Sequence, residues 1–325
     1  MTESPLLQVN DLVKHYPTGG GRAVRAVDGV SFTVARGQTL SLVGESGCGK
    51  STVARAVLRL VTPTSGEIIL DGIRIDELTA EVLRPLRRRI QIVFQDPFSS
   101  LNPRMRVRDI IAEPIRNFGI ERGENLRKRV AALLETVRLP RDAADRFPHE
   151  FSGGQRQRIG IARALATQPD LIVCDEAVSG LDVSVKAQIV NLLQDIQRDF
   201  GLALLFISHD LAVVEHMTQR VAVMYLGKIV EEGGRRDIFV SPKHPYTQAL
   251  LSAVPIPDPE RAPTRVLLSG DVPSSVNPPS GCRFHTRCPH AFARCQKEDP
   301  VMKAVGPQHL AACHLYDEPQ VAPKR

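Results

Sequence analysis

The chain contains no tryptophan, and only 4 of its 325 residues are tyrosine. A surface that stacks nucleic-acid bases needs aromatic rings, so this scarcity argues against nucleic acid as a partner. Long apolar runs are also missing. The longest, such as Leu202–Ile207, fits a buried strand and is far shorter than the roughly 20 residues that cross a bilayer. The first residues lack the basic and apolar regions of a signal peptide, so we expect the chain to stay in the cytoplasm.

The composition is otherwise that of an ordinary globular protein, with 42% hydrophobic and 24% charged residues. The formal net charge of +6 is modest and would favour an anionic membrane face or nucleic acid only weakly. The densest basic cluster, at residues 87–89, is interpreted as a solvated face.

A glycine-rich stretch separates an apolar run at residues 39–43 from a stretch without helix breakers at residues 52–60. This stretch and the residue after it are Gly44, Glu45, Ser46, Gly47, Cys48, Gly49, Lys50, Ser51 and Thr52. Strand, glycine-rich turn and helix form a phosphate-binding loop, because glycines let backbone N–H groups face inward and the helix N-terminus adds positive charge. Lys50 would reach the β- and γ-phosphates, and the Ser51 hydroxyl would bind Mg²⁺. We therefore predict that the chain binds a nucleotide.

Two adjacent carboxylates, Asp175 and Glu176, follow the apolar strand at residues 171–174. Asp175 at the strand end can hold Mg²⁺, directly or through water. Glu176 would then lie near the γ-phosphate and could polarise the attacking water. An acidic pair alone is usually a solvated turn, but its position after a phosphate loop favours catalysis.

A second helix N-terminus that could bind an anion begins at Ser152, Gly153, Gly154 and Gln155. Ser152 is a good N-cap residue, and the two glycines leave the helix end open. One chain has already bound its phosphates with the Lys50 loop. We therefore expect this second helix end to meet the γ-phosphate of a nucleotide on another chain.

These motifs together resemble the ATP-binding subunit of an ABC transporter over roughly residues 5–240. They occur in the family order: the phosphate loop, Gln95 after an apolar strand, residues 152–155, Asp175 with Glu176, residues 179–182 and residues 208–210. The resemblance implies that Tyr16 stacks on adenine, that Gln95 senses Mg²⁺ and water, that Asp182 contacts the partner chain and that His209 holds the γ-phosphate. It also implies a head-to-tail pair of chains that closes on two ATP molecules.

One residue departs from the family pattern. Gly180 stands where such families usually have alanine. Glycine adds backbone freedom without removing a donor, so we expect a modest loosening of this loop and no loss of activity.

The predicted fold is α/β: a P-loop NTPase with a mainly parallel sheet, because strands alternate with helices. An antiparallel β-layer at residues 6–43 precedes it, and a helical insertion is expected at about residues 98–165. Nine of the 38 residues from 242 to 279 are proline, which marks a boundary. The predicted domains are a nucleotide-binding domain at residues 1–240 and a small C-terminal extension at residues 241–325.

Four of the six cysteines lie in that extension: Cys282, Cys288, Cys295 and Cys313. Structural disulfides are unusual in a cytosolic protein, whereas four thiolates can hold Zn²⁺ or a [4Fe–4S] cluster. The spacing lacks the paired C-x₂-C of most zinc sites and favours the iron–sulfur cluster. The alternative is a set of reduced cysteines packed in a small subdomain.

The extension resembles that of oligopeptide/dipeptide importer ATPases at residues 244–247, 281–284 and 287–289. Residues 100–104 and 174–179 look like the F-type of the two ATPases in those systems. Some members of that family carry a [4Fe–4S] cluster on these cysteines. The resemblance implies a paralogous second ATPase subunit, two transmembrane permeases and an extracytoplasmic peptide-binding protein. It places the chain peripherally on the cytoplasmic face of the inner membrane.

Two other functions compete with peptide import. Nickel and glutathione importers carry the same extension, and soluble ABC-type ATPases act on DNA or ribosomes. The soluble relatives usually pair two nucleotide domains in one chain, whereas this chain has a single phosphate loop. A metal-sensing regulator would not explain the intact Asp175 and Glu176 pair.

Overall fold

The computed structural model describes residues 4–254 and 270–317, and its largest element is a twisted sheet. In spatial order this sheet runs through β11 (Lys303–Gly306), β12 (His309–Ala311), β10 (Lys228–Gly234), β9 (Arg220–Tyr225), β3 (Thr39–Val43), β8 (Ala203–Ser208), β7 (Leu171–Asp175) and β6 (Ile90–Val93). The strands from β9 to β6 pair in parallel, and those from β9 to β11 pair antiparallel. The predicted mainly parallel sheet is confirmed.

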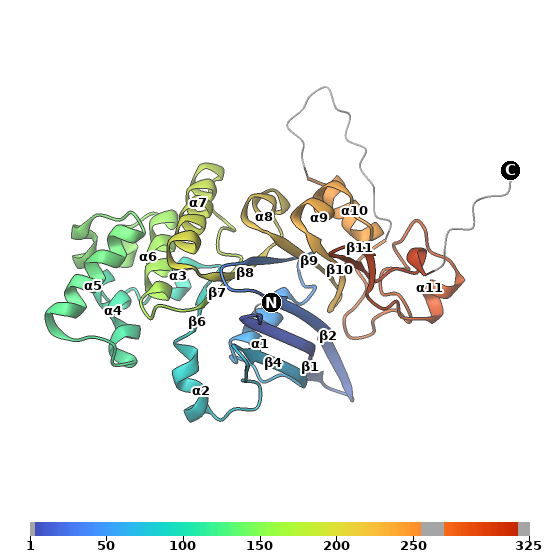
Figure 1. Ribbon diagram of the computed structural model, residues 1–325, viewed down its shortest axis with the longest axis horizontal. Helices are drawn as coiled ribbons and strands as arrows, with labels where there is room; N and C mark the ends of the chain where they lie inside the picture. Colours follow the sequence, from blue (N-terminus) through green and yellow to red (C-terminus); the bar gives the residue numbers. More distant parts are fainter. Residues whose placement is uncertain (1–3, 255–269, 318–325) are drawn as a thin grey trace, which may run out of the picture.

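The central strands are covered on both faces (Figure 1). Every residue of β3, β7 and β8 is buried; β7 and β8 are apolar runs up to their last residue, as expected for strands covered on both faces, whereas β3 also buries Thr39 and Ser41. One face carries α7 (Val183–Phe200), α8 (Leu211–Met217), α9 (Arg235–Val240) and α10 (Pro245–Ser252). The opposite face carries α1 (Lys50–Val57), which begins at Lys50, within the glycine-rich stretch.

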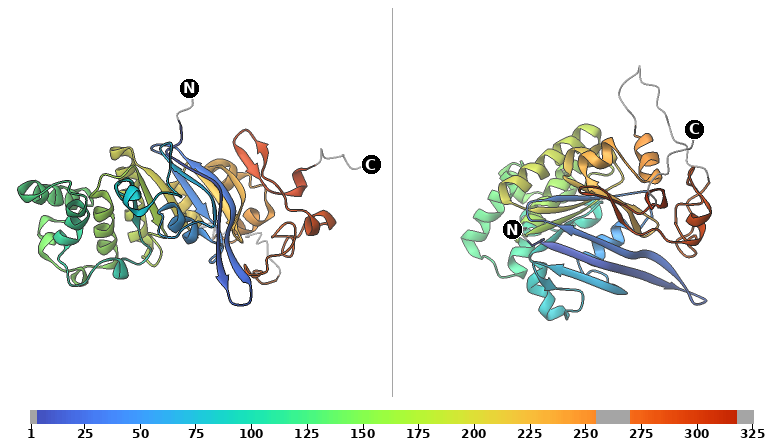
Figure 2. Two further views of the ribbon diagram at one scale, coloured as in Figure 1. Left: turned by 90° about the horizontal axis from the view of Figure 1, so that it is seen from below. Right: turned by 45° about the vertical axis from the view of Figure 1, so that its right-hand side comes forward.

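The N-terminal segment forms a smaller antiparallel sheet beneath α1 (Figures 1 and 2). Its strands, in spatial order, are β2 (Arg22–Val34), β1 (Leu7–Thr18), β4 (Ser65–Leu70) and β5 (Ile73–Arg74). One apolar cluster joins the two sheets through α1, with Leu7, Val53 and Leu205 each fully buried. Burying each such side chain contributes about 1.5–3 kcal/mol, so the hairpin is held firmly against the phosphate-loop helix.

A helical subdomain extends from one end of the main sheet, on the left in Figure 1. Its elements are α3 (Pro97–Ser100), α4 (Val107–Asn117), α5 (Gly123–Thr136), the 3-10 helices η1 (Arg141–Asp145) and η2 (Pro148–Glu150), and α6 (Gly153–Leu165). A further helix, α2 (Ala80–Arg87), precedes β6. Ile111, Leu134 and Ile159, from α4, α5 and α6, lie in one buried cluster. The subdomain occupies the stretch where the sequence predicts a helical insertion.

The C-terminal extension packs against the end of the main sheet. Strand β12 pairs with β10, so the sheet continues into the extension, which also contains α11 (Ala293–Lys297) and η3 (His314–Tyr316). The buried carboxylate of Glu231 on β10 binds His309 Nε2 at 2.6 Å and accepts bonds from the backbone N–H groups of Lys243 and His244 at 2.6 and 2.9 Å. Removing one partner of such a buried group is strongly destabilising, so Glu231 anchors the extension. The domain boundary at residue 240 stays a prediction.

Among the described residues, no helix combines the length and the apolar character that a membrane crossing requires.

Candidate active site

The glycine-rich stretch forms a tight loop between β3 and α1, and two of its glycines have no room for a side chain. A Cβ on Gly44 would lie 2.1 Å from the Met224 carbonyl oxygen, and one on Gly49 would lie 2.0 Å from that of Ala26. Both glycines also have positive φ angles, of +150° and +109°. The loop therefore needs glycine at these positions for its close backbone contacts and its backbone conformation.

The Lys50 side chain lies within this loop and is almost fully buried. Its Nζ donates to the carbonyl oxygens of Gly44 and Glu45 at 2.8 and 2.9 Å. A buried ammonium at the start of α1 adds its charge to that of the helix N-terminus. The loop therefore presents the positive potential that phosphate groups require.

Ser51 and Asp175 bring two oxygen ligands together from α1 and β7. The Ser51 hydroxyl donates to Asp175 Oδ1 at 2.9 Å. Burial raises the pKa of the Asp175 carboxyl above its ordinary value, and the negative charge of Glu176 raises it further, whereas the bond from Ser51 lowers it. A divalent cation would favour the ionised form. The donor set fits Mg²⁺, which takes one or two protein oxygens and completes its shell with substrate phosphates and water.

Three strand ends meet around the Glu176 carboxylate. Gln95, after β6, donates from Nε2 to Glu176 Oε2 at 3.0 Å, and Nδ1 of His209, after β8, lies 3.3 Å from Glu176 Oε1. Glu176 itself has a φ angle of +50°, which is uncommon for a residue with a side chain. Such strain is found where a side chain must be aimed at a functional site. The structure thus brings these predicted residues together.

The phosphate loop and Glu176 line a common cavity of about 270 Å³. Its lining residues are Val24, Ala26, Ser46, Gly47, Gly49, Lys50, Ser51, Thr52, Gln95, Glu176 and Ser275. Tyr16 lies opposite Val24 in the pairing of β1 with β2. This places the predicted adenine-stacking ring one strand away from the cavity wall, and its role stays a prediction.

The helix end at Ser152 lies elsewhere on the molecule. Ser152 caps α6: its hydroxyl accepts from the Gln155 N–H at 3.4 Å, and the Gln155 side chain accepts from the Ser152 N–H at 3.0 Å. Both residues are exposed, whereas Gly154 is buried against Val185 of α7. In the described part of the chain, residues 152–155 do not line the Lys50 cavity. The helix end is free to meet a second molecule.

The loop at residues 179–182 lies beside that helix end, and Gly180 and Asp182 in it are exposed. Gly180 has a φ angle of +75°, and within the described residues no atom lies within 4 Å of a Cβ built on it. An alanine at this position would therefore be disfavoured by the positive φ angle and not by a steric clash. Asp182 precedes α7 and is exposed, as a contact to a partner chain requires.

The four cysteines of the extension gather near one another. The thiol of Cys313 lies within electrostatic influence of Cys282, Cys288 and Cys295, and the Cys282 N–H donates to the Cys295 carbonyl at 2.9 Å. Burial raises the pKa of Cys282 to about 11 and that of Cys313 to about 12. Within the described residues, however, no group of three or more His, Cys, Asp or Glu side chains has the arrangement of a metal site. The iron–sulfur interpretation is therefore not supported by the side-chain arrangement.

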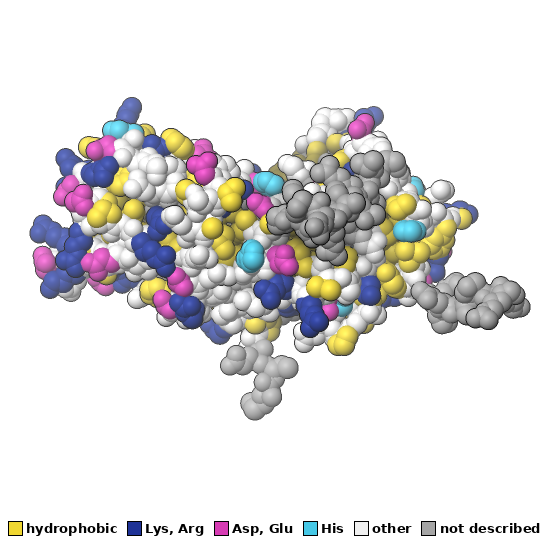
Figure 3. Space-filling view, turned by 90° about the horizontal axis from the view of Figure 1, so that it is seen from above, with side chains coloured by type: hydrophobic (Ala, Val, Ile, Leu, Met, Phe, Trp, Pro, Cys, Tyr) yellow, Lys and Arg dark blue, Asp and Glu magenta, His cyan; other side chains and the backbone are white. Residues whose placement is uncertain are grey.

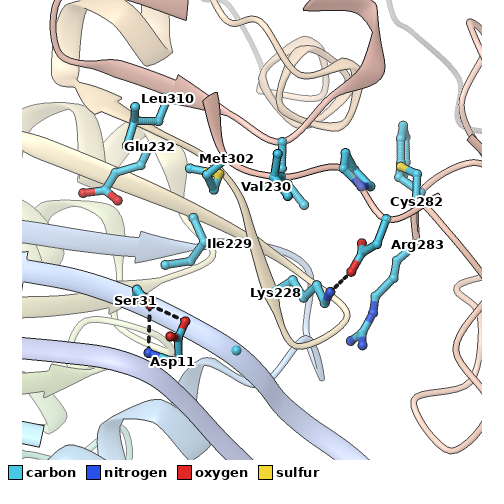
Figure 4. Close-up of a pocket in the computed structure, with 16 residues that line it drawn as sticks. Asp11, Ser31, Lys228, Ile229, Val230, Glu232, Cys282, Arg283, Met302 and Leu310 are labelled. Atoms are coloured by element: carbon cyan, nitrogen blue, oxygen red, sulfur yellow. Dashed lines mark hydrogen bonds and ion pairs between the residues drawn. The ribbon is translucent and has the colours of Figure 1, made fainter. Parts of the chain in front are cut away.

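A second cavity, of about 420 Å³, lies between the β1–β2 hairpin, β10 and the extension (Figure 4). Its walls include the apolar side chains of Ile229, Val230 and Met302. Lys228 forms an ion pair with Asp299 at this cavity. The cavity lies along the contact between the extension and the nucleotide domain.

Sequence reasoning missed three residues of the extension that reach the phosphate loop. The Tyr246 hydroxyl accepts from the Glu45 N–H at 2.8 Å, Arg287 pairs with the Glu45 carboxylate, and Ser275 lines the cavity. Tyr246 and Arg287 lie in stretches that indicate the importer family, but nothing in their local pattern indicates contact with a loop some 200 residues earlier.

Two family profiles match the chain. The profile described as ABC transporter matches residues 27–179. The profile described as oligopeptide/dipeptide transporter, C-terminal region, matches residues 230–295. The first spans the phosphate loop through Glu176, and the second includes Tyr246, Arg287 and three of the four tail cysteines.

Individual proteins are similar over nearly the whole length. A probable peptide ABC transporter ATP-binding protein of Sinorhizobium fredii is 55% identical over 316 residues, covering 95% of this chain and 90% of that protein. An oligopeptide transport ATP-binding protein of Bacillus subtilis is 50% identical over 323 residues, covering 97% of this chain and 98% of that protein.

Among solved structures, a dimeric ATP-binding cassette in a post-hydrolysis state, bound to ADP and Pi, is 30% identical with a TM-score of 0.65. The match covers 71% of this chain and 99% of the cassette. A part of an ABC transporter complex from Clostridium perfringens is 29% identical with the same TM-score, covering 74% of this chain and 92% of that one. These structures support the predicted P-loop NTPase fold.

The contacts of Glu176 predict the effect of removing its charge. Glu176→Gln keeps the shape but loses the base, so kcat for ATP hydrolysis should fall by about 10²–10⁴-fold while ATP still binds. Steady-state kinetics and equilibrium ATP binding measure the two effects. Glu77→Gln, on an exposed carboxylate, is the matched control and should leave both unchanged. Unchanged hydrolysis in Glu176→Gln would exclude this role for Glu176.

Proposed function

The chain belongs to the ABC transporter family, and from this membership we propose that it is the ATP-hydrolysing subunit of an importer of di- and oligopeptides. The observation that carries the proposal is the match of the oligopeptide/dipeptide C-terminal region, combined with a cavity that the phosphate loop, Gln95 and Glu176 line together. The full-length similarity to proteins named for peptide transport supports this cargo.

The residues around the phosphate-loop cavity supply the chemistry of an ABC-type ATPase. The loop and Lys50 bind the phosphates, and Ser51 with Asp175 would hold Mg²⁺. The cation neutralises charge on the phosphates when it is bound. Glu176 accepts a proton from the attacking water, and Gln95 and His209 hold its carboxylate in place. His209 is also exposed enough to reach the γ-phosphate.

A second ATPase subunit, a paralogue of this chain, would complete the site. The exposed N-terminus of α6 would meet the γ-phosphate bound to the partner, and Asp182 would contact the partner chain. Backbone N–H groups aimed at a phosphate from a helix end stabilise the charge that develops on it. The similarity to a dimeric cassette supports this head-to-tail arrangement.

Two transmembrane permeases would dock near Gln95. Phe94 and Phe98, on either side of it, are 40% and 64% exposed, and exposed aromatic rings are typical of protein contacts. The Phe94 carbonyl accepts from Gln157 of α6 at 3.2 Å, and the Arg156 guanidinium lies 3.7 Å from the Phe98 ring centre. A movement of α6 would therefore also move Phe94 and Phe98, the residues proposed to contact the permeases. The chain would sit peripherally on the cytoplasmic face of the inner membrane, with a peptide-binding protein on the other side.

The basic side chains of the helical subdomain do not favour nucleic acid as the alternative partner. Figure 3 shows Lys and Arg gathered over that end of the molecule and mixed with Asp and Glu. Many are paired locally: Arg116 with Asp109, Arg138 with Asp195 and Arg141 with Glu135. Retention of the protein by nucleic acid at moderate salt would support the alternative.

The four tail cysteines are proposed as ligands of a [4Fe–4S] cluster, with Zn²⁺ or no metal as the alternatives. Their spacing in the sequence supports the proposal, whereas the described side chains do not have the arrangement of a metal site. Burial keeps the thiols of Cys282 and Cys313 protonated at neutral pH, so cluster binding would have to release protons.

The two-chain site predicts that ATP turnover per chain rises with concentration or on adding the partner subunit. Ser152→Tyr, which blocks the exposed helix end, should lower kcat in the pair by about a hundredfold. Thr79→Tyr, at the exposed start of α2, is the control and should have no effect. Full activity of a strict monomer, measured by sedimentation alongside ATPase assays, would contradict the arrangement.

The cargo proposal predicts peptide uptake by the reconstituted transporter. Vesicles holding the permeases, both ATPases and the binding protein should take up labelled di- and oligopeptides in an ATP-dependent manner. Vesicles with the Glu176→Gln subunit should not. Stimulation of the ATPase by nickel or glutathione, and not by peptides, would overturn the peptide assignment while leaving the ATPase intact.

The cluster proposal predicts a brown protein after anaerobic purification, with iron and sulfide in equal amounts. The absorbance should disappear in Cys282→Ser and Cys313→Ser and persist in Cys174→Ala, which changes a buried cysteine of β7. Zinc in place of iron, or no metal in protein prepared this way, would rule the cluster out.

A further inference from the structure

Glu45 is the residue through which the C-terminal extension contacts the phosphate loop. It is the second residue of the loop, directly after Gly44, and its side chain points away from the lining of the Lys50 cavity toward the extension. Its backbone N–H and its carboxylate are both bound by residues more than 200 positions later.

The carboxylate is held by Arg287 in a paired geometry. Arg287 Nη1 donates to Glu45 Oε2 at 2.9 Å, and Nη2 donates to Oε1 at 3.2 Å. The Arg287 side chain is 8% exposed, so this ion pair is largely removed from water. A bidentate guanidinium–carboxylate pair fixes orientation as well as distance. Arg287 therefore restricts where Glu45 can move.

The backbone of Glu45 is held from a second direction. Its N–H donates at 2.8 Å to the hydroxyl of Tyr246, a fully buried residue of α10. The rings of Tyr246, Tyr225 and Phe284 pack together, with centroids 4.6–5.4 Å apart. The Arg287 guanidinium lies 6.0 Å from the Tyr225 ring centre, at the side of this aromatic cluster. The two side chains that contact Glu45 are therefore packed in or against a rigid aromatic cluster.

The same residue also contacts the phosphate-binding lysine. The Glu45 carbonyl accepts from Lys50 Nζ at 2.9 Å. A shift of Glu45 would therefore displace both the loop backbone and the ammonium group. In this way the extension acts on the part of the loop that receives the β- and γ-phosphates.

We propose that Arg287 is a positioning residue of the ATP site, which sets the affinity of the phosphate loop for the triphosphate by holding Glu45. Tyr246 supports the same residue through its backbone. Arg287 lies apart from Glu176 and the attacking water, so its effect is equal in the ground state and the transition state. Such a residue changes KM and leaves kcat nearly constant.

The experiment measures ATPase kinetics of the full chain with its partner subunits. Arg287→Met keeps an unbranched, largely apolar side chain but removes the charge and the donors, and it should raise KM for ATP about tenfold with kcat changed less than about threefold. Glu45→Gln should raise KM by a similar factor. The double variant should raise KM no further than the single variant with the larger effect, because both substitutions remove the same interaction. Arg287→Lys retains the charge but cannot form the bidentate pair, so its KM for ATP should lie between those of the unaltered protein and of Arg287→Met.

Arg283→Met is the matched control. Arg283 lies four residues earlier in the same segment, is 7% exposed, and forms its ion pair with Asp28 of β2 (its side chain is seen in Figure 4). The Arg283→Met variant should lower the unfolding temperature about as much as Arg287→Met does, but its KM for ATP should stay within about twofold of that of the unaltered protein. An equal rise of KM in both variants would mean that docking of the extension as a whole matters, and would overturn the proposal.

Two other outcomes would also overturn it: an unchanged KM in folded Arg287→Met, or full additivity in the double variant. If Arg287→Met does not fold, Glu45→Gln probes the same contact from the loop side. The readout is ATP hydrolysis, so the result does not depend on which cargo the transporter carries.

Discussion

The carboxyl ends of the parallel strands meet at one edge of the main sheet, and the ATP site depends on this alignment. Lys50 follows β3, Asp175 ends β7 and Glu176 follows it, His209 follows β8 and Gln95 follows β6. Each strand delivers one kind of group: a cation, a pair of carboxylates, an imidazole and an amide. Crevices at strand carboxyl ends are where open α/β sheets bind ligands. In an antiparallel sheet, the carboxyl ends of neighbouring strands would instead lie at opposite edges.

The same alignment explains how the site can communicate with the rest of the molecule. Gln95 binds Glu176 on one side, and the preceding Phe94 carbonyl binds Gln157 of α6 on the other. Glu176, Gln95 and Gln157 of α6 are therefore linked by hydrogen bonds through residues 94–95, and the Phe98 ring lies against Arg156 of the same helix. This segment therefore connects the candidate ATP site to the helical subdomain.

The C-terminal extension contributes to the site from the opposite direction. Glu231 anchors it to β10, the paired strands β10 and β12 continue the main sheet, and Arg287 and Tyr246 reach the phosphate loop. Cys288 follows Arg287 directly, so one peptide bond links the cysteine group to the residue that holds Glu45. The extension is continuous with the nucleotide domain both in its hydrogen bonding and in its core.

The sequence alone determined the features whose residues are neighbours in the chain or end successive strands. The glycine-rich turn, the acidic pair and the capped helix at Ser152 are local patterns with a local physical cause. Tertiary structure alone decided that Arg287 and Tyr246 hold Glu45, that Ser275 lines the cavity, and how the four cysteines are arranged. These contacts join residues that are distant in sequence or set by the packing of irregular loops. Such contacts depend on how buried surfaces fit together, and no spacing along the chain encodes that fit.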